Sequence, residues 1–82
     1  MKLLVRPAAV DDIRAARDRY ADADRRLDEQ LVEDLDRLFA LLEAFPRSAP
    51  VVEGYESIRR ALLRRFPYAV FYRLTEPDRI DV

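Results

Sequence analysis

The 82-residue sequence has no cysteine and no histidine. Disulfide bonds, thiolate nucleophiles and thiolate metal sites are therefore excluded, and so is the side chain that most often serves as general base or metal ligand. Ser48 and Ser57 lack a histidine partner, which excludes a serine hydrolase. The carboxylates of the predicted helices show no ligand spacing. We therefore expect no metal and no cofactor, and any chemistry must use Arg, Tyr, Asp, Glu, Lys or Ser side chains.

Long apolar runs are absent as well. The first residues, MKLLVRPAA, have too short an apolar run before Arg6 and Pro7 for a signal peptide, and no stretch approaches the roughly 20 apolar residues of a membrane span. Half of the residues are apolar and there is a single glycine, which indicates an ordered globular chain. A chain of this length can bury one modest core. We expect one soluble domain over residues 1–82, located in the cytoplasm and not bound to a membrane.

The charge is nearly balanced in total but unevenly distributed. Residues 1–56 carry 9 basic and 13 acidic side chains, a net charge of -4, and residues 57–82 carry 6 basic and 3 acidic ones, a net charge of +3. The two parts add up to the net charge of -1. A basic C-terminal third can attract anions locally even though the whole chain is weakly acidic.

A helical hairpin is expected in the first half of the chain. The stretch Ala8–Ala44 has no glycine or proline and is rich in Ala, Arg, Glu and Leu, which are strong helix formers. A single helix of about 37 residues would be about 55 Å long, which is much longer than a compact domain of this size. The helix must therefore fold back. The segment Ala21–Arg25 is the expected break, where Asp22 or Asp24 can cap the second helix.

The rest of the sequence predicts short strands around this hairpin. Runs rich in Val, Ile, Phe and Tyr are typical of strands, and Pro or Gly residues mark the loops between them. We expect an opening strand at Lys2–Arg6 and, after the helices, a loop at Phe45–Ser57. Two strands follow, at Ile58 to about Arg64 and at Tyr68–Leu74, joined by a corner at Arg65–Pro67. A turn at Thr75–Asp78 leads to a short last strand from Arg79 onward. This order indicates an α+β fold in which the N-terminal strand and the later, mainly antiparallel strands form a small sheet with both helices on one face.

Arginines gather in the stretch IRRALLRRFPYAVFYRL, residues 58–74, which contains no acidic residue. Because side chains alternate along a strand, Arg60 and Arg64 are expected on one face and Arg59 and Arg65 on the other. One interpretation is a solvated strand whose arginines protect a sheet edge from aggregation. The other is a cationic strip that binds phosphate or the carboxylates of a partner, which suits the forked guanidinium group. The absence of local acidic partners favours the strip.

Aromatic residues interleave with these arginines at Phe66, Tyr68, Phe71 and Tyr72. Aromatic rings among arginines can stack on nucleic-acid bases, so direct nucleic-acid binding stays open. A sheet covered by helices also needs large rings in its core. We therefore expect Phe71 and at least one of the tyrosines to be core residues.

Three stretches resemble a known family of proteins. They are VRPAAVDDIRAARDRY followed by the leucine-rich helix, LEAFPRSAPVV and, above all, IRRALLRRFPYAVFYRL. They are similar to the ParE branch of the RelE/ParE toxins of bacterial type II toxin–antitoxin systems, and the resemblance covers nearly the whole chain. It implies a small toxin with the order of elements derived above. It also implies a protein partner, an antitoxin whose C-terminal segment wraps around the toxin and neutralises it.

The two branches of this family imply different activities. RelE-like members cut mRNA on the ribosome with basic residues and a tyrosine, whereas ParE-like members poison DNA gyrase. When Tyr68 is matched to the third-strand tyrosine of the RelE branch, Arg60 falls at one basic position of the cleavage set. Leu62 and Ala69 fall where two others are needed, and apolar side chains cannot stabilise the charge of a phosphodiester transition state. The resemblance therefore favours a toxin that binds gyrase over an enzyme.

The predicted contacts with an antitoxin or a target come from the arginine-rich strands, and no catalytic residue is assigned. These contacts are Arg59, Arg60, Arg64, Arg65, Arg73, Tyr68 and Tyr72. Family members usually complete the strand that begins here at Arg79 and then carry a basic tail, so a short last strand is expected to leave its neighbour open to strand addition. The alternatives are a RelE-like mRNA endonuclease and a degenerate, non-toxic module that still binds an antitoxin.

Overall fold

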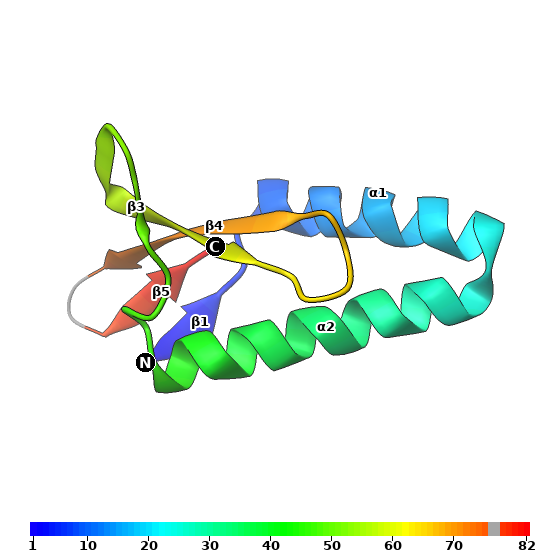
Figure 1. The fold of residues 1–82 in the computed structure, drawn as a ribbon, viewed down its shortest axis with the longest axis horizontal. Coiled ribbons are helices and arrows are strands. Elements are labelled where there is room, and N and C mark those ends of the chain that lie inside the picture. Colours follow the sequence, from blue (N-terminus) through cyan, green and yellow to red (C-terminus); the bar gives the residue numbers. More distant parts are fainter. Residues whose placement is uncertain (76–77) are drawn as a thin grey trace.

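The computed structural model describes residues 1–75 and 78–82, and within them the chain forms two helices and five strands (Figure 1). The elements are β1 Lys2–Leu4, α1 Pro7–Ala23, α2 Arg25–Ala44, β2 Val51–Val52, β3 Tyr55–Leu62, β4 Ala69–Thr75 and β5 Arg79–Asp81. The predicted α+β fold, with a strand, a helical hairpin and then a small sheet, is confirmed.

The two helices fold back on each other at Asp24, inside the predicted break. Asp24 has an extended backbone, with φ -163° and ψ 122°, and its side chain accepts a hydrogen bond from the backbone N–H of Arg26 at 2.9 Å. This is the geometry of an N-cap, which satisfies one of the free donors at the start of α2. The Arg17 guanidinium, on α1, donates to the Asp28 carboxylate at 2.6 Å and ties the two helices together next to the break. The longest extent of the molecule is consequently 39 Å, shorter than one continuous helix would require.

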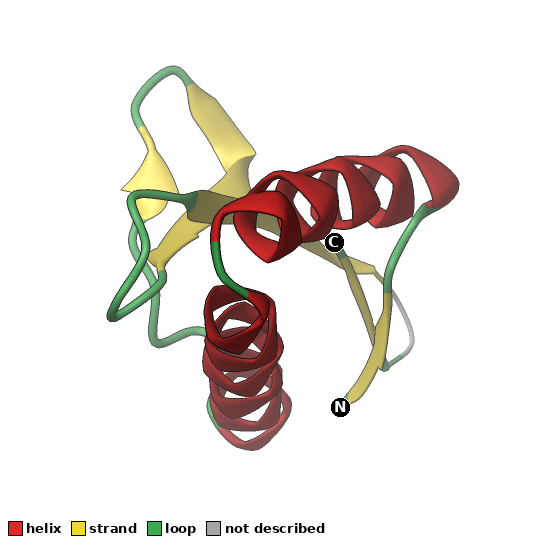
Figure 2. Cartoon of the chain, turned by 90° about the vertical axis from the view of Figure 1, so that its right-hand side faces the viewer, coloured by secondary structure: helices red, strands yellow, loops and turns green. Residues whose placement is uncertain are grey.

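The sheet has the strand order β1-β5-β4-β3-β2. β1 runs parallel to β5, and the other neighbours are antiparallel. The backbone N–H of Val82 donates to the Leu4 carbonyl at 2.9 Å, and that of Arg6 donates to the Val82 carbonyl at 3.1 Å, so the two ends of the described chain lie side by side. In Figure 2 the two helices lie nearer the viewer than most of the strands.

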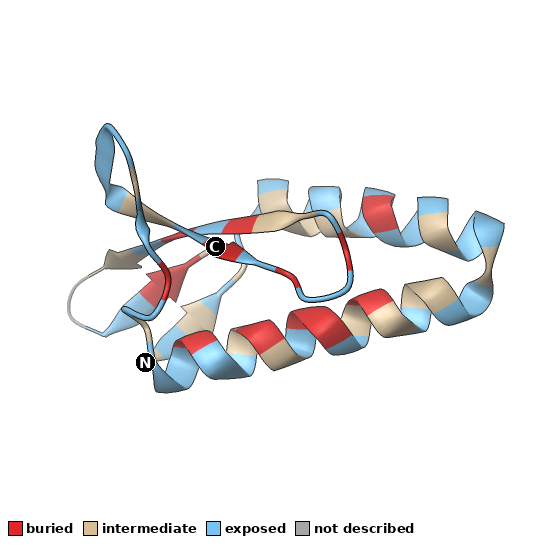
Figure 3. Ribbon diagram, viewed as in Figure 1, coloured by how far each residue is buried: buried red, intermediate tan, exposed pale blue. Residues whose placement is uncertain are grey.

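The core forms between α2 and the helix-covered face of the sheet, where the buried residues of Figure 3 meet. Four leucines follow one face of α2, at Leu31, Leu35, Leu38 and Leu42. They share the core with Ala61, Val70, Tyr72 and Ile80 from three different strands. The leucine spacing of i, i+4, i+7 and i+11 keeps one helix face apolar, which is the reason α2 packs on the sheet along its length.

Several strand boundaries differ from the predicted ones. Val51–Val52 was expected in a loop but pairs with β3, because Gly54 adopts a positive φ of 83° and lets the chain turn back within two residues. β3 therefore starts at Tyr55 and ends at Leu62, so Arg64 lies outside the strand. β1 ends at Leu4 because Arg6 already serves as the N-cap of α1, with Pro7 at its first position.

The turn predicted at Thr75–Asp78 has its two central residues, 76 and 77, outside the described residues. Thr75 is the last residue of β4, and Arg79 begins β5, which confirms a short last strand.

Two adjacent leucines of α2 should differ strongly in how much they contribute to the free energy of unfolding. Leu42 is 1% exposed and Leu41 is 40% exposed. Leu42→Ala should lower the free energy of unfolding by about 2–5 kcal/mol, because it leaves a cavity between the helix and the sheet. Leu41→Ala should lower it by about 0.5 kcal/mol or less. Urea denaturation followed by circular dichroism measures both, and equal losses for the two variants would contradict the proposed core.

Candidate functional site

In the folded protein, the arginines of the predicted strip lie in three separate places. Arg59 lies on the face of β3 that is turned toward the core, next to Ala61 in the alternation. Its Nη1 donates to the backbone carbonyls of Ala49, at 2.7 Å, and Arg47, at 3.2 Å. These bonds hold the segment before β2 against β3. Arg59 is therefore engaged in a contact within the protein.

Arg60 and Arg73 lie on the other face of the sheet and are exposed. Arg60 is paired with Phe71 across β3 and β4, and Arg73 follows Phe71 by two residues, so all three side chains share that face. Neither guanidinium has a hydrogen-bond or ion-pair partner among the residues the structure describes. Both are available to an external anion.

Arg64 and Arg65 lie in the turn between β3 and β4, not in a strand. The predicted grouping of Arg60 with Arg64 and of Arg59 with Arg65 is therefore wrong, since the alternation stops at Leu62. Their exposed side chains belong to a shallow pocket of about 230 Å³ that also includes Gln30, Glu33 and Arg37 of α2. A single cationic strip thus does not exist in the folded protein.

A buried carboxylate holds this turn in place. Asp34 of α2 is 4% exposed and accepts hydrogen bonds from the backbone N–H groups of Arg65, at 2.8 Å, and Arg64, at 3.3 Å. It also accepts from the Arg37 guanidinium at 2.9 Å. A buried charge is tolerated only when it is paired and hydrogen-bonded in this way. Asp34 therefore positions the backbone from which Arg64 and Arg65 extend.

Burial and hydrogen bonding have opposite effects on the pKa of Asp34. Burial acts to raise the pKa of this carboxyl, but the hydrogen bonds from Arg65, Arg37 and Arg64 outweigh burial, and the net pKa is lowered. Asp34 was not among the site residues predicted from the sequence. A signal was present, because position 34 lies between Leu31 and Leu38 on the apolar face of the predicted helix. A charge on such a face indicates a specific buried partner.

The two predicted tyrosines have different environments. The Tyr72 side chain is buried, its hydroxyl donates to the Pro46 carbonyl at 2.8 Å, and burial raises its pKa. The expectation of at least one core tyrosine is confirmed for Tyr72. Phe71, in contrast, is 52% exposed, so its predicted place in the core is wrong. Adjacent strand residues point to opposite faces, and the apolar residues on both sides of Phe71 did not reveal which face was inward.

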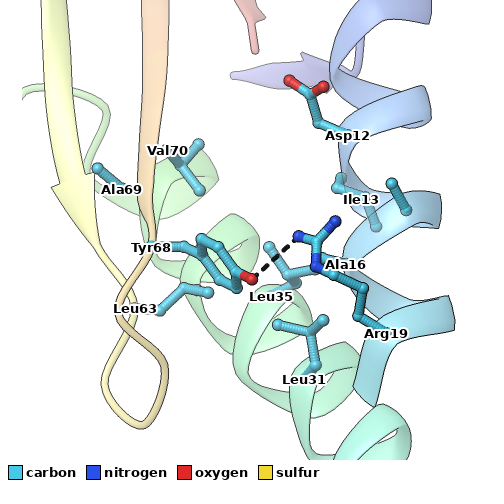
Figure 4. Close-up of a pocket in the computed structure, with 11 residues that line it drawn as sticks. Asp12, Ile13, Ala16, Arg19, Leu31, Leu35, Leu63, Tyr68, Ala69 and Val70 are labelled. Atoms are coloured by element: carbon cyan, nitrogen blue, oxygen red, sulfur yellow. Dashed lines mark hydrogen bonds between the residues drawn. The ribbon is translucent and has the colours of Figure 1, made fainter. Parts of the chain in front are cut away.

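Tyr68 lies at a groove between α1 and β4, with α2 as its floor (Figure 4). Its hydroxyl accepts a hydrogen bond from Nη2 of Arg19 at 3.2 Å, which is the main reason its pKa is lowered. The groove has a volume of about 340 Å³ and is lined mainly by apolar side chains, among them Ile13, Ala16 and Leu35. Such a groove can accept apolar side chains of a partner.

Residues 1–75 and 78–82 contain neither a metal-binding cluster nor a membrane-spanning helix. In this part of the chain no three His, Cys, Asp or Glu side chains gather closely enough to hold a metal ion. The two described helices are not long and apolar enough to span a membrane.

Comparison with models of known protein families identifies a match over nearly the whole chain. The family described as "ParE toxin of type II toxin-antitoxin system, parDE" matches residues 3–82, nearly the whole chain. The chain belongs to the ParE toxin family. The predicted family resemblance is thereby confirmed, and with it a toxin of the type II toxin–antitoxin class that has an antitoxin protein as its partner. A search of curated proteins found no match.

In this ParE-family toxin, Asp34 should make stability depend on pH. Because the folded-state pKa of Asp34 is below its unfolded-state value of about 3.9, the ionised group stabilises the fold above that value and loses this effect as the pH falls through the folded-state pKa. Asp34→Asn should reduce the free energy of unfolding by about 1–3 kcal/mol near neutral pH, since an amide cannot accept all three donors. The difference from wild type should shrink in acid.

Urea denaturation at a series of pH values from about 7 down to 3 measures this difference. Asp36→Asn, at an exposed position of the same helix, is the control and should behave like wild type at every pH. A difference between wild type and Asp34→Asn that stayed constant over the whole range would show that the carboxylate charge is not what holds the turn.

Proposed function

We propose that this ParE-family toxin acts by binding DNA gyrase and that a cognate antitoxin neutralises it by covering the exposed arginines. One observation carries the proposal. Arg60, Arg64, Arg65 and Arg73 are exposed, and no side chain among the described residues pairs with their guanidinium groups. Guanidinium groups that stay free in the isolated protein are suited to bidentate contacts with carboxylates of a protein partner.

The environment of the candidate catalytic groups supports binding over cleavage. The sequence has no histidine, the Tyr72 hydroxyl is buried against Pro46, and the Tyr68 hydroxyl is engaged by Arg19. Leu62 is 59% exposed on the sheet, at a position where the mRNA-cleaving branch needs a basic group. An exposed leucine cannot stabilise developing negative charge on a phosphate. The geometry therefore favours a toxin without a hydrolytic centre.

Growth after induction tests the toxin directly. We expect expression of this 82-residue chain in bacterial cells to reduce colony-forming ability, and co-expression of the protein encoded by the adjacent gene to restore it. The reason is that the antitoxin would cover the binding surface before the target can reach it. Colony counts with and without the second gene measure both effects.

The target is tested with purified gyrase and relaxed plasmid DNA. Addition of the toxin should inhibit supercoiling or trap double-strand breaks, and prior mixing with the antitoxin should prevent this. Cleavage of translated mRNA with gyrase unaffected would instead indicate a RelE-like endonuclease. Unimpaired growth from a soluble, folded protein that binds its antitoxin would indicate a non-toxic antitoxin-binding module. Either result would overturn the gyrase proposal.

A further inference from the structure

A small polar pocket lies where the turn between β3 and β4 meets α2. In Figure 1 this turn, coloured yellow to orange, passes next to the middle of α2, and the hydrogen bonds from its backbone to Asp34 join the two. Residues of α2 form one wall, and the turn forms the other. We call it the turn pocket, and its lining residues are Gln30, Glu33, Asp34, Arg37, Arg64 and Arg65.

The wall formed by α2 follows from the spacing of its residues. The four of them, from Gln30 to Arg37, stand at i, i+3, i+4 and i+7, which places them on one face of the helix. The lining side chains that the structure describes are all polar or charged. The volume of about 230 Å³ is below the roughly 300–1,000 Å³ of pockets that enclose whole organic ligands. The turn pocket therefore suits one compact charged group.

The charge that the turn pocket offers to a ligand is positive. Asp34 is 4% exposed, and its carboxylate already accepts from the backbone of the turn and from Nε and Nη2 of Arg37. The side chains of Arg64 and Arg65 are exposed and have no partner among the described residues. Glu33 is the remaining carboxylate and is exposed. Three guanidinium groups thus face one carboxylate that is satisfied within the protein and one that is in contact with solvent.

The backbone of this site is fixed before any ligand arrives. Asp34 accepts the backbone N–H of Arg65 at 2.8 Å and that of Arg64 at 3.3 Å, so both arginine side chains extend from a held turn. The same carboxylate holds the Arg37 guanidinium from the helix side at 2.9 Å. Groups that are already ordered lose less freedom on binding, which favours affinity.

We propose that the turn pocket binds a terminal phosphate group, carried by a nucleotide or present as free pyrophosphate or phosphate. Such a group has three strong acceptor oxygens and up to about two negative charges. Its oxygens can accept charge-assisted hydrogen bonds from Arg64, Arg65 and the free Nη1 of Arg37 together. This site goes beyond the proposed function and does not depend on gyrase as the target.

Two other anions fit the turn pocket less well. A phosphodiester of DNA has two free oxygens and a single charge, and the net charge of -1 of the whole chain gives no general attraction to a polyanion. A carboxylate of a protein partner also has two oxygens, enough for one bidentate contact with one guanidinium. The polar walls would offer nothing to the apolar side chains that form the centre of protein interfaces.

The test is calorimetric titration of the purified 82-residue protein with pyrophosphate and with ATP, in a buffer free of phosphate and sulfate. Arg64→Glu and Arg65→Glu should each weaken binding by about tenfold or more, because a charge-assisted hydrogen bond is lost and a repelling charge is added. Both variants keep the backbone N–H groups that bond to Asp34. The control is Arg14→Glu, which makes the same change of charge at an exposed position of α1 and should bind like wild type. Circular dichroism verifies that all three variants are folded.

The pattern of binding decides the proposal and names the source of the phosphate. Binding of both probes would assign the site to phosphate groups in general, and binding of ATP alone would assign it to a nucleotide. If neither probe binds, or if Arg14→Glu weakens binding as much as Arg65→Glu, the proposal is overturned. Fluorescence anisotropy with a labelled DNA duplex and with a labelled oligoglutamate peptide runs in parallel. Either of these binding at Arg64 and Arg65, with no binding of pyrophosphate or ATP, would assign the turn pocket to that partner and also overturn the proposal.

None of these titrations contains gyrase or an antitoxin. A negative result would therefore leave the proposed toxin function standing. Conversely, a toxin that spares gyrase could still bind phosphate in the turn pocket, so the two proposals fail independently.

Discussion

The Asp34 carboxylate is the contact on which the arrangement of the arginines depends. It lies on the helix that carries the core leucines and accepts two backbone N–H groups from the turn between β3 and β4. Those two strands carry Arg60 and Arg73, which are exposed. One buried charge, balanced by Arg37, thus connects the helical hairpin to the turn that joins the two interior strands. Without acceptors, the backbone donors of this turn would be left unsatisfied at the edge of the core.

Because side chains alternate along a strand, neighbouring residues of β3 and β4 face opposite sides of the sheet. Tyr72 enters the core while Phe71 faces outward, and Arg59 bonds to backbone carbonyls within the protein while Arg60 stays free. The core side is closed by α2, so its chemistry serves stability. The outer side combines exposed apolar and cationic groups, which is a poor arrangement for an isolated protein and a suitable one for a protein with a partner. Membership of the ParE toxin family implies an antitoxin protein as a partner.

Much of the fold could be predicted because it follows from local physical rules. The uninterrupted helix-forming stretch was too long for a compact domain, so the break and the cap at Asp24 could be located. The hairpin formed by β2 and β3 was missed because its strand of two residues leaves no periodic signal, and only the φ of Gly54 makes the turn possible. The site was predicted as one strip. The end of β3 at Leu62 divides it, and no local pattern marks that end.

By itself the sequence determined the class of fold, the leucine face of α2, the exclusion of cysteine and histidine chemistry, and the family. These depend on composition, on helical periodicity and on motif order, all of which are properties of the chain without its folded contacts. Only the tertiary structure decided which arginines are free, that Phe71 is outside and Tyr72 inside, and that Asp34 holds the arginine turn. The reason is that β3 and β4 carry apolar residues on both faces. Which face becomes the core is settled by where α2 packs.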